Sequence, residues 1–319
     1  MFRKTLTLIL TLLTALLVGC APQTQPIVAS TPTDILVTEA PAAEGLTFTD
    51  GLGREVTLSA PAKRVVSLAP SNTEVLFAVG AGEQIVGRDE FSDYPAEAAA
   101  IDSVGGSMGE YSAEAIVALE PDLVIAAEIN TPELVNQLES LGVTVYYLSN
   151  PHTLEEMYTN LEIVAALTGH DATELIDSLK ARVAAVDEKI ASTSERPSVF
   201  YEIDGSDSAK PYSYGPGTFG NLLIERAGGF NIGSEATDPY PQISLEQIVV
   251  ADPSIIILGD SMWGVTSEAV IAREGWSTIA AVKSSQIFPI DDNLISRPGP
   301  RLVDGLEALA KILHPGLFE

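Results

Sequence analysis

One seventeen-residue segment occurs twice in this chain, and the repeat limits what the chain can fold into. Residues 112–128, SAEAIVALEPDLVIAAE, align without a gap with residues 244–260, SLEQIVVADPSIIILGD, and six of the aligned pairs are identical. Each copy has a serine suited to cap a helix, an apolar helix face ended by a proline, and a run typical of a buried strand. Only two copies exist, so the repeat predicts two related α/β lobes rather than a solenoid.

A second and weaker echo precedes the repeat in each half of the chain. Ser67-Leu-Ala-Pro70 matches Ser213-Tyr-Gly-Pro216 at an offset of 146, and Leu76 and Leu222 continue at the same offset. Each lobe is therefore predicted to begin with a strand, an S-x-x-P loop, a helix and a glycine turn. We expect function to lie in the gap between the two lobes.

Strand and helix patterns alternate through the rest of the chain, which favours largely parallel sheets. An Asp-Gly pair between two alternating runs predicts a β-hairpin over 46–58. Helical spacing of leucine, isoleucine and valine covers 153–192 and is interrupted at Thr168-Gly169-His170. The predicted organisation is an N-terminal lobe over 46–150, connecting helices over 151–195 and a C-terminal lobe over 196–319. Because a helical connection is stiffer than a loop, we expect the lobes to close by small angles.

The composition excludes several classes of protein. With 46% hydrophobic and 19% charged residues among 319, the chain can bury two cores and is not a disordered one. Its formal net charge of −27 opposes the approach of polyanions, which excludes nucleic acid as a partner. The histidines, His152, His170 and His314, have no partners at metal-ligand spacing, so we expect no direct metal site.

The N-terminus has the pattern of a secretory signal. Two basic residues precede an apolar run over 6–18 that is too short to span a bilayer. The following Leu-Val-Gly-Cys resembles the bacterial lipobox, which implies cleavage of 1–19 and a lipid on Cys20, the only cysteine in the chain. Residues 21–45 are rich in Pro, Thr, Ala and Gln and are expected to form a disordered tether to the membrane.

The folded part resembles a known family through several segments whose order and spacing agree. These are RVVSLAPSNTEVLFAVGAG, FSDYP, SAEAIVALEPDLVIA, PYPQISLEQIV and RPGPRLVDGLEALAKILHP. They are similar to the substrate-binding proteins of bacterial ABC importers, in the class that serves iron-siderophores, haem and vitamin B12. The resemblance implies an α/β fold of two Rossmann-like lobes with mostly parallel sheets, joined by a single long rigid helix.

The resemblance also implies the partners. A metal chelate would arrive already formed and be held between the lobes, without a resident cofactor, and a monomeric protein would deliver it to an ABC permease dimer with its cytoplasmic ATPase. Proteins of this class dock through one acidic residue on each lobe, and the matching positions here are Glu114 and Glu246. A glutamate near a helix N-terminus also stabilises the helix through its dipole, and this structural role is the alternative interpretation of both residues. Glu74 is a weaker candidate for the same docking surface.

The ligand site is carried over from the vitamin B12-binding member of the family, whose cleft is lined by aromatic rings. Three matching positions keep a ring, namely Phe91, Tyr212 and Tyr240, whereas two others become Met108 and Ala127. Flat rings suit a large planar chelate, and the two departures count against a corrinoid. We therefore expect the ligand to be an iron chelate, and a corrinoid is the next candidate.

Arginines near the cleft have two readings, because a chain this acidic offers many salt-bridge partners. Arg297 matches a cleft-facing arginine of the B12-binding relative and could hold acidic groups of a ligand, whereas Arg301 is expected to be structural. Further residues considered for the cleft are Tyr94, Tyr111, Tyr214 and Trp263.

A secreted serine hydrolase is the competing reading. Ser107 lies in Gly105-Gly-Ser-Met-Gly109, which satisfies the G-x-S-x-G pattern, and His314 lies downstream of it. The nucleophile turn requires a strand that runs directly into the serine and a helix directly after it. Only IDSV precedes the motif here, so the sequence favours the binding protein.

Overall fold

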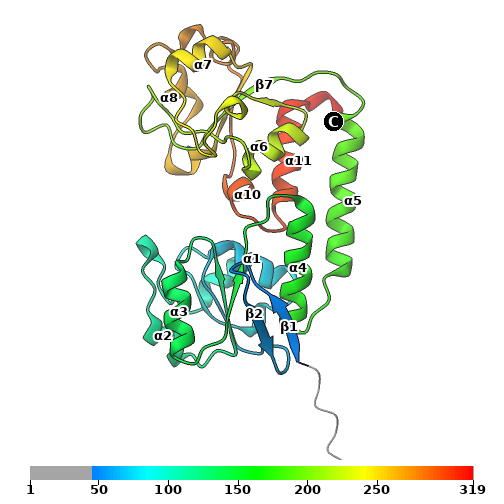
Figure 1. The fold of residues 1–319 in the computed structure, drawn as a ribbon. Coiled ribbons are helices and arrows are strands. Elements are labelled where there is room, and N and C mark those ends of the chain that lie inside the picture. Colours follow the sequence, from blue (N-terminus) through cyan, green and yellow to red (C-terminus); the bar gives the residue numbers. More distant parts are fainter. Residues whose placement is uncertain (1–44, 319) are drawn as a thin grey trace, which may run out of the picture. The chain divides into compact units, whose positions relative to one another are not determined.

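The structure is a computed structural model that describes residues 45–318 (Figure 1). It begins with the predicted β-hairpin, in which β1 (Leu46–Thr49) pairs antiparallel with β2 (Glu55–Leu58). Asp50 closes the turn, because its carboxylate accepts backbone N–H bonds from Leu52 and Arg54. Gly53 supplies the left-handed conformation that the turn requires, with φ of 75°.

The N-terminal lobe contains a four-stranded parallel sheet in the order β4-β3-β5-β6. Its strands are β3 (Val65–Ser67), β4 (Ile85–Arg88), β5 (Leu123–Ala127) and β6 (Val145–Leu148). Its helices are α1 (Pro70–Ala78), α2 (Ala113–Ala118) and α3 (Pro132–Ser140). Every residue of β5 is buried, as expected for a central parallel strand with both faces covered.

The C-terminal lobe repeats this sheet. Its strands are β7 (Ser198–Glu202), β8 (Phe230–Asn231), β9 (Ile255–Leu258) and β10 (Ile287–Pro289), in the order β8-β7-β9-β10. Its helices are α6 (Phe219–Arg226), α7 (Leu245–Ala251), α8 (Ser267–Ile271), α9 (Ala280–Lys283) and α10 (Asn293–Ser296). The two sheets are separate and have the same strand order, so the predicted pair of related α/β lobes is confirmed.

The repeated segment has the same backbone in both lobes. Ser112 caps α2 and Ser244 caps α7, each by accepting the N–H of the residue three positions on. Before the central strand, Glu120 and Asp252 both adopt a left-handed conformation, with φ of 47° and 43°. A strained turn kept at equivalent places supports a true duplication, since non-glycine residues seldom adopt positive φ.

The second sequence echo is only partly right. Ser67 ends β3 and α1 begins shortly after it, as predicted. Ser213 instead lies within a long segment, 203–218, that separates β7 from α6. Strand-like backbone pairing holds this segment in place, since Tyr212 forms isolated antiparallel bridges with Asp204 and Gln242. The C-terminal lobe therefore carries a loop that the N-terminal lobe lacks.

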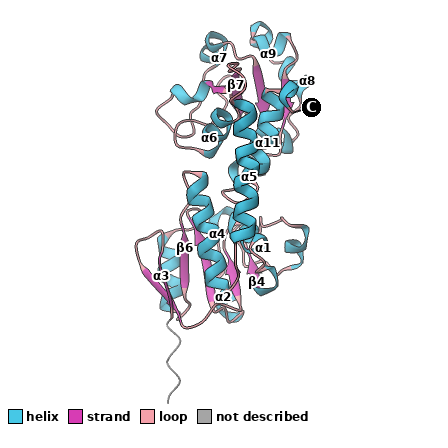
Figure 2. Cartoon of the chain, turned by 90° about the vertical axis from the view of Figure 1, so that its right-hand side faces the viewer, coloured by secondary structure: helices cyan, strands magenta, loops and turns pink. Residues whose placement is uncertain are grey.

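The connection between the lobes consists of two helices, α4 (Leu154–Thr168) and α5 (Thr173–Ile190). Gly169 ends α4 in a left-handed conformation, with φ of 77°, at the predicted interruption. The single rigid helix that the resemblance implies is therefore not confirmed. Helix α5 packs against α4 and against α11 (Leu302–Leu313), and Figure 2 shows it extending from one sheet toward the other.

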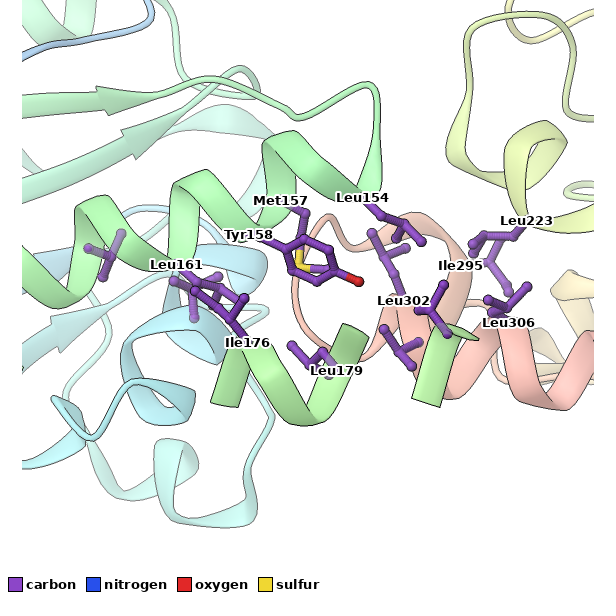
Figure 3. Close-up of a cluster of buried hydrophobic side chains, with 14 of the residues drawn as sticks. Leu154, Met157, Tyr158, Leu161, Ile176, Leu179, Leu223, Ile295, Leu302 and Leu306 are labelled. Carbon is purple, nitrogen blue, oxygen red and sulfur yellow. The ribbon is translucent and has the colours of Figure 1, made fainter. Parts of the chain in front are cut away.

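A continuous hydrophobic core joins these helices to both sheets. Figure 3 shows part of this core, and the side chains labelled there are Leu154, Met157, Tyr158, Leu161, Ile176, Leu179, Leu223, Ile295, Leu302 and Leu306. Each buried leucine or isoleucine contributes about 1.5–3 kcal/mol of transfer free energy, so the shared core holds the lobes more firmly than a linker would. Within residues 45–318, no helix is both long enough and apolar enough to cross a bilayer.

Candidate functional site

Large apolar side chains lie exposed where the parallel strands end. Those that follow β4, β5, β7, β8 and β9 are Phe91, Tyr94, Ile129, Tyr212, Tyr240, Met262 and Trp263. Such side chains are normally buried, and in open α/β sheets ligands bind outside the carboxyl ends of the strands. Both lobes therefore present an apolar surface at the edge where a ligand is expected. Phe91, Tyr212 and Tyr240 were predicted from the sequence, whereas Ile129 and Met262 were missed.

A pocket of about 300 Å³ is lined by residues from both lobes. Glu128 and Asn150 line it from the N-terminal lobe, His152 lines it from the connecting segment, and Tyr240 and Ser296 line it from the C-terminal lobe. The Asn150 backbone N–H donates to the Glu128 carboxylate at 3.1 Å, which fixes this acidic group at the pocket. The pocket is at the small end of the range for ligand sites, so a large ligand would also contact the exposed rings around it.

Tyr240 is the predicted ligand residue that this pocket includes. Tyr240 is 57% exposed, and its ring centroid lies 6.1 Å from that of Tyr214, which is almost fully buried. The hydroxyls of Tyr214 and Tyr201 both donate to Asp292, at 3.0 and 2.7 Å. Burial, together with the Asp292 charge, raises the pKa of both tyrosines well above the usual value. Tyr214 therefore acts as a neutral support for Tyr240.

Phe91 is positioned by a buried acid in the N-terminal lobe. Its backbone N–H donates to Asp89 at 2.8 Å, and the Tyr111 hydroxyl donates to the same carboxyl group at 3.0 Å. Burial raises the pKa of Asp89, with these hydrogen bonds opposing the rise. Tyr111 thus belongs to the support of the loop. Met108 lies on a single 3₁₀ turn, Ser107–Gly109, and its side chain is outside the described part of the structure.

The two arginines form an ion network with the N-terminal lobe. Arg297 lies 3.0 Å from Glu74 and 2.6 Å from Asp93, and Arg301 donates to Glu74 at 2.8 Å. The Arg301 guanidinium also lies 3.9 Å from the ring centroid of Tyr94. Arg301 is therefore structural, as expected, and Arg297 already has two acidic partners. The Glu74 side chain is only 1% exposed, so the suggestion that it belongs to a docking surface is wrong.

Glu114 and Glu246 occupy the same position in α2 and α7, the second residue of each helix. Both side chains are exposed, and neither forms a salt bridge within residues 45–318. Figure 1 labels the two helices, one in each lobe. Their accessibility is what a docking role requires. Cys20 lies outside the described residues.

The hydrolase reading is not supported by the geometry. Gly106, which precedes Ser107, has a φ of 112°, and only a single 3₁₀ turn surrounds the serine, so no strand-to-helix elbow exists there. His314 is buried in the other lobe, where its ring nitrogen lies 3.3 Å from the Gly228 carbonyl oxygen. The two members of the supposed triad are therefore engaged in different parts of the fold. Within residues 45–318, no group of three or more His, Cys, Asp or Glu could hold a metal ion.

A buried charged group in the C-terminal lobe was missed from the sequence. It comprises Glu202 at the end of β7, Asp260 just after β9, and Arg273. The last pair of the sequence repeat, Glu128 and Asp260, was the available signal, because it places an acid directly after the central strand of each lobe. The signal does not reveal that Asp260 is buried whereas Glu128 is exposed.

The fold and the site together define a two-lobed binding protein. Two duplicated parallel sheets share one core, and ring-bearing loops of both lobes border a common pocket. The family model described as periplasmic binding protein matches residues 65–294, and the chain belongs to this family.

Individual relatives agree with this assignment. YvrC of Bacillus subtilis (strain 168), named an uncharacterized ABC transporter substrate-binding lipoprotein, is 33% identical over 281 residues, covering 86% of this chain and 87% of the relative. The vitamin B12-binding protein of Vibrio cholerae is 32% identical over 270 residues, covering 79% of this chain and 90% of the relative. The apo structure of the periplasmic heme-binding protein RhuT from Roseiflexus sp. RS-1 has a TM-score of 0.71 at 25% identity, covering 80% and 99% of the two chains. The resemblance to ABC-importer substrate-binding proteins, which are transport proteins that work with a permease and an ATPase, is confirmed.

Proposed function

We propose that this protein captures a preformed metal chelate outside the cytoplasm and delivers it to an ABC permease dimer driven by a cytoplasmic ATPase. The observation that carries the proposal is the set of exposed rings after the strands of both sheets, beside a pocket that both lobes line. In this role the protein is a monomeric carrier without catalysis and without a resident cofactor. The chelate brings its own metal ion.

Within this class of ligands we favour a corrinoid. Sequence alone favoured an iron chelate narrowly, but the 32% identical Vibrio cholerae relative is named for vitamin B12. The exposed rings of Phe91 and Tyr240 can pack against the flat face of a large macrocycle at little entropic cost. Haem and iron-siderophores are the alternatives, and the structural likeness to a haem-binding protein supports the first of them.

Titration calorimetry of the full-length chain in detergent, with cyanocobalamin, haemin and ferrioxamine B, tests the ligand class. We expect cyanocobalamin to bind with a Kd of about 1 μM or tighter, and Tyr240→Ala to weaken it roughly tenfold. Phe230→Ala is the matched control, because Phe230 is also an exposed ring but begins a strand instead of following one. If none of the three compounds binds, the chelate receptor is ruled out.

Docking to the permease is assigned to Glu114 and Glu246. Two matched charges on separate lobes would give a two-point register on a partner that bears arginines. The double variant Glu114→Lys/Glu246→Lys should abolish uptake in cells and leave ligand affinity unchanged. The control is Glu162→Lys/Glu188→Lys, which makes the same charge change at exposed positions of α4 and α5. Loss of ligand affinity in the first variant would place the two glutamates in the ligand site and contradict the docking role.

We assign membrane attachment to a lipid on Cys20, followed by the tether 21–45, which would keep the folded part at the outer face of the membrane. The similarity to YvrC, which is named a lipoprotein, supports this assignment. Cys20→Ser should move the protein from the membrane fraction to the soluble fraction. Retention in the membrane would show that another segment anchors the chain.

A further inference from the structure

A groove lies on the C-terminal lobe beside α7, the helix that carries Glu246 (Figure 1). Its volume is about 400 Å³, and it is lined by α7 and by two segments that precede this helix in the chain. Ile232 and Val250 are among its apolar lining residues, and Glu235 and Glu246 are its acidic ones. The residue assigned to permease docking therefore borders an apolar depression.

Among the large apolar residues that the structure describes, Val250 is the most exposed. It is 86% exposed, and it lies one helical turn after Glu246 on the same face of α7. The sequence repeat places Ala118 at the matching position of α2, four residues after Glu114. The C-terminal lobe thus has a branched apolar side chain beside its glutamate, where the N-terminal lobe has only a methyl group.

The exposure of Val250 favours a protein as the occupant of the groove over a small molecule. Small-molecule sites bury most of the surface of their ligand. A lining residue that leaves 86% of its own surface in solvent cannot enclose a small ligand. A protein partner can insert one side chain into the groove while the surface around that side chain covers Val250.

Charge determines which kind of protein fits. Among the described residues that line the groove, the charged ones are Glu235 and Glu246, and neither forms a salt bridge within residues 45–318. A complementary partner therefore brings a cation. A second copy of this chain, with a formal net charge of −27, and an anionic lipid surface are both repelled.

The groove and the pocket that both lobes line share one stretch of chain. Pro239 and Tyr240 line the pocket, and the next three residues, 241–243, line the groove. A partner in the groove therefore contacts the segment that carries Tyr240, a residue proposed to hold the ligand. The recipient of that ligand is the partner for which such a contact is expected.

We propose that the groove is the apolar part of the C-terminal docking site for the permease. A permease segment pairs a cationic side chain with Glu246 and packs a neighbouring aliphatic or aromatic side chain against Ile232 and Val250. The inference rests on the proposed docking role of Glu246 and adds a contact that the N-terminal lobe does not offer at Ala118. The C-terminal lobe therefore contributes more to docking than the N-terminal lobe does.

Photocrosslinking in cells that produce the permease tests the groove without knowledge of the ligand. Three full-length chains each carry one p-benzoylphenylalanine, in place of Val250, of its repeat counterpart Ala118, or of Ile271, an exposed apolar residue of α8. We expect the residue introduced at Val250 to crosslink to a membrane-spanning permease subunit, identified by mass spectrometry, at least fivefold more than the one at Ile271. Adding Glu246→Lys should remove this crosslink.

The contribution of the apolar contact is measured with Val250→Ala. Binding to the permease complex purified in lipid nanodiscs should weaken about tenfold, because two buried carbons are lost from the interface. Ile271→Ala is the matched control, since it shortens another exposed side chain of the same lobe and should leave binding within twofold of wild type.

The outcomes separate this inference from the docking role itself. If the chain altered at Ala118 crosslinks to the permease and the one altered at Val250 does not, or if Val250→Ala binds as tightly as wild type, the groove is wrong and docking stands. If neither chain crosslinks to a permease subunit, the docking role fails and the groove fails with it. A crosslink from Val250 to a second copy of this chain or to a soluble protein also contradicts the proposal.

Discussion

The buried carboxyl of Asp260 should make the folded protein less stable as pH rises through 7. We expect the free energy of unfolding of wild type to fall, relative to Asp260→Asn, between about pH 4 and pH 7. The groups that face Asp260 are Glu202, which repels its charge and shares a hydrogen bond with it, Arg273, which is paired with Glu202 and attracts it, and the exposed Asp204. Replacing only Asp260 leaves the other three in place, so the difference between the two chains reports the proton that Asp260 and Glu202 hold between them.

The sign and size follow from the raised pKa. Below pH 4 the carboxyl is protonated in both folded and unfolded chains, and wild type has its full stability. The unfolded chain releases the proton near pH 4, whereas the folded chain holds it until about pH 7, so stability is lost across this interval and then levels off. A rise from 3.8 to about 7 is roughly three pKa units at about 1.4 kcal/mol each, which sets an upper limit on the order of 4 kcal/mol.

Urea unfolding at half-unit steps from pH 4.5 to 8.5 measures the effect, with the fluorescence of Trp276, which is fully buried, as the signal. Asp204→Asn is the matched control, because Asp204 lines one pocket together with Asp260, but hydrogen bonds from Ser206 lower its pKa. Asp204 contributes stability above its unfolded pKa, and this contribution is lost only as the pH falls below that value. Asp204→Asn keeps Asp260, so its free energy of unfolding should still fall as the pH rises toward 7. Parallel pH profiles for wild type and Asp260→Asn would refute the assignment of a raised pKa.

Three further predictions concern stability measured by urea unfolding at pH 7. Glu74→Gln should cost about 3–5 kcal/mol, because it leaves two largely buried arginines without their shared partner, and a cost below 1 kcal/mol would show that the network is replaceable. Ser112→Ala and Ser244→Ala should each cost about 1 kcal/mol through loss of an N-cap. The two losses should add in the double variant, since the caps lie in separate lobes, and strong non-additivity would contradict this. Trp276→Ala should cost about 3–5 kcal/mol by leaving a cavity in the C-terminal core, and a smaller loss would mean that the core collapses around it.

The fold was predictable where local pattern and burial coincide. The repeat gave both caps and both central strands, because serine caps and all-apolar strands are set by residues close in sequence. The predicted hairpin over 46–58 and the interruption at Gly169 also depend on local backbone conformation, and both are confirmed. The path of the connection was not predictable, since packing of α5 against α11 depends on contacts between distant segments.

The candidate site was predictable only in part, for the same reason. Exposed rings at strand ends follow from the strand pattern, and Phe91 and Tyr240 are found there. One of the two acidic partners of Arg297 is Glu74, which lies 223 positions away, so no local spacing predicts this pair. The motif around Ser107 shows the reverse case, in which a local pattern is present without the structure it suggests. The G-x-S-x-G pattern is short, and the fold has no strand-to-helix turn at this serine.

The duplicated lobes differ directly after the first strand of each parallel sheet, and the difference can be traced through the strand registers. Ser67 pairs with Ile125 and Tyr201 with Ile257, so the next residues, Leu68 and Glu202, occupy equivalent places. An apolar residue in one lobe is thus a buried acid in the other. The segment 203–218, which the N-terminal lobe lacks, supplies the Gly205 N–H that binds Asp260.

Burial of Asp260 is therefore a property of the longer loop and not of the repeat. Glu128, its repeat partner, has no such loop beside it and is exposed at the pocket that both lobes line. A carboxylate held in the interior beside a second acid is costly to stability unless it keeps its proton, which is why the pKa of Asp260 is raised.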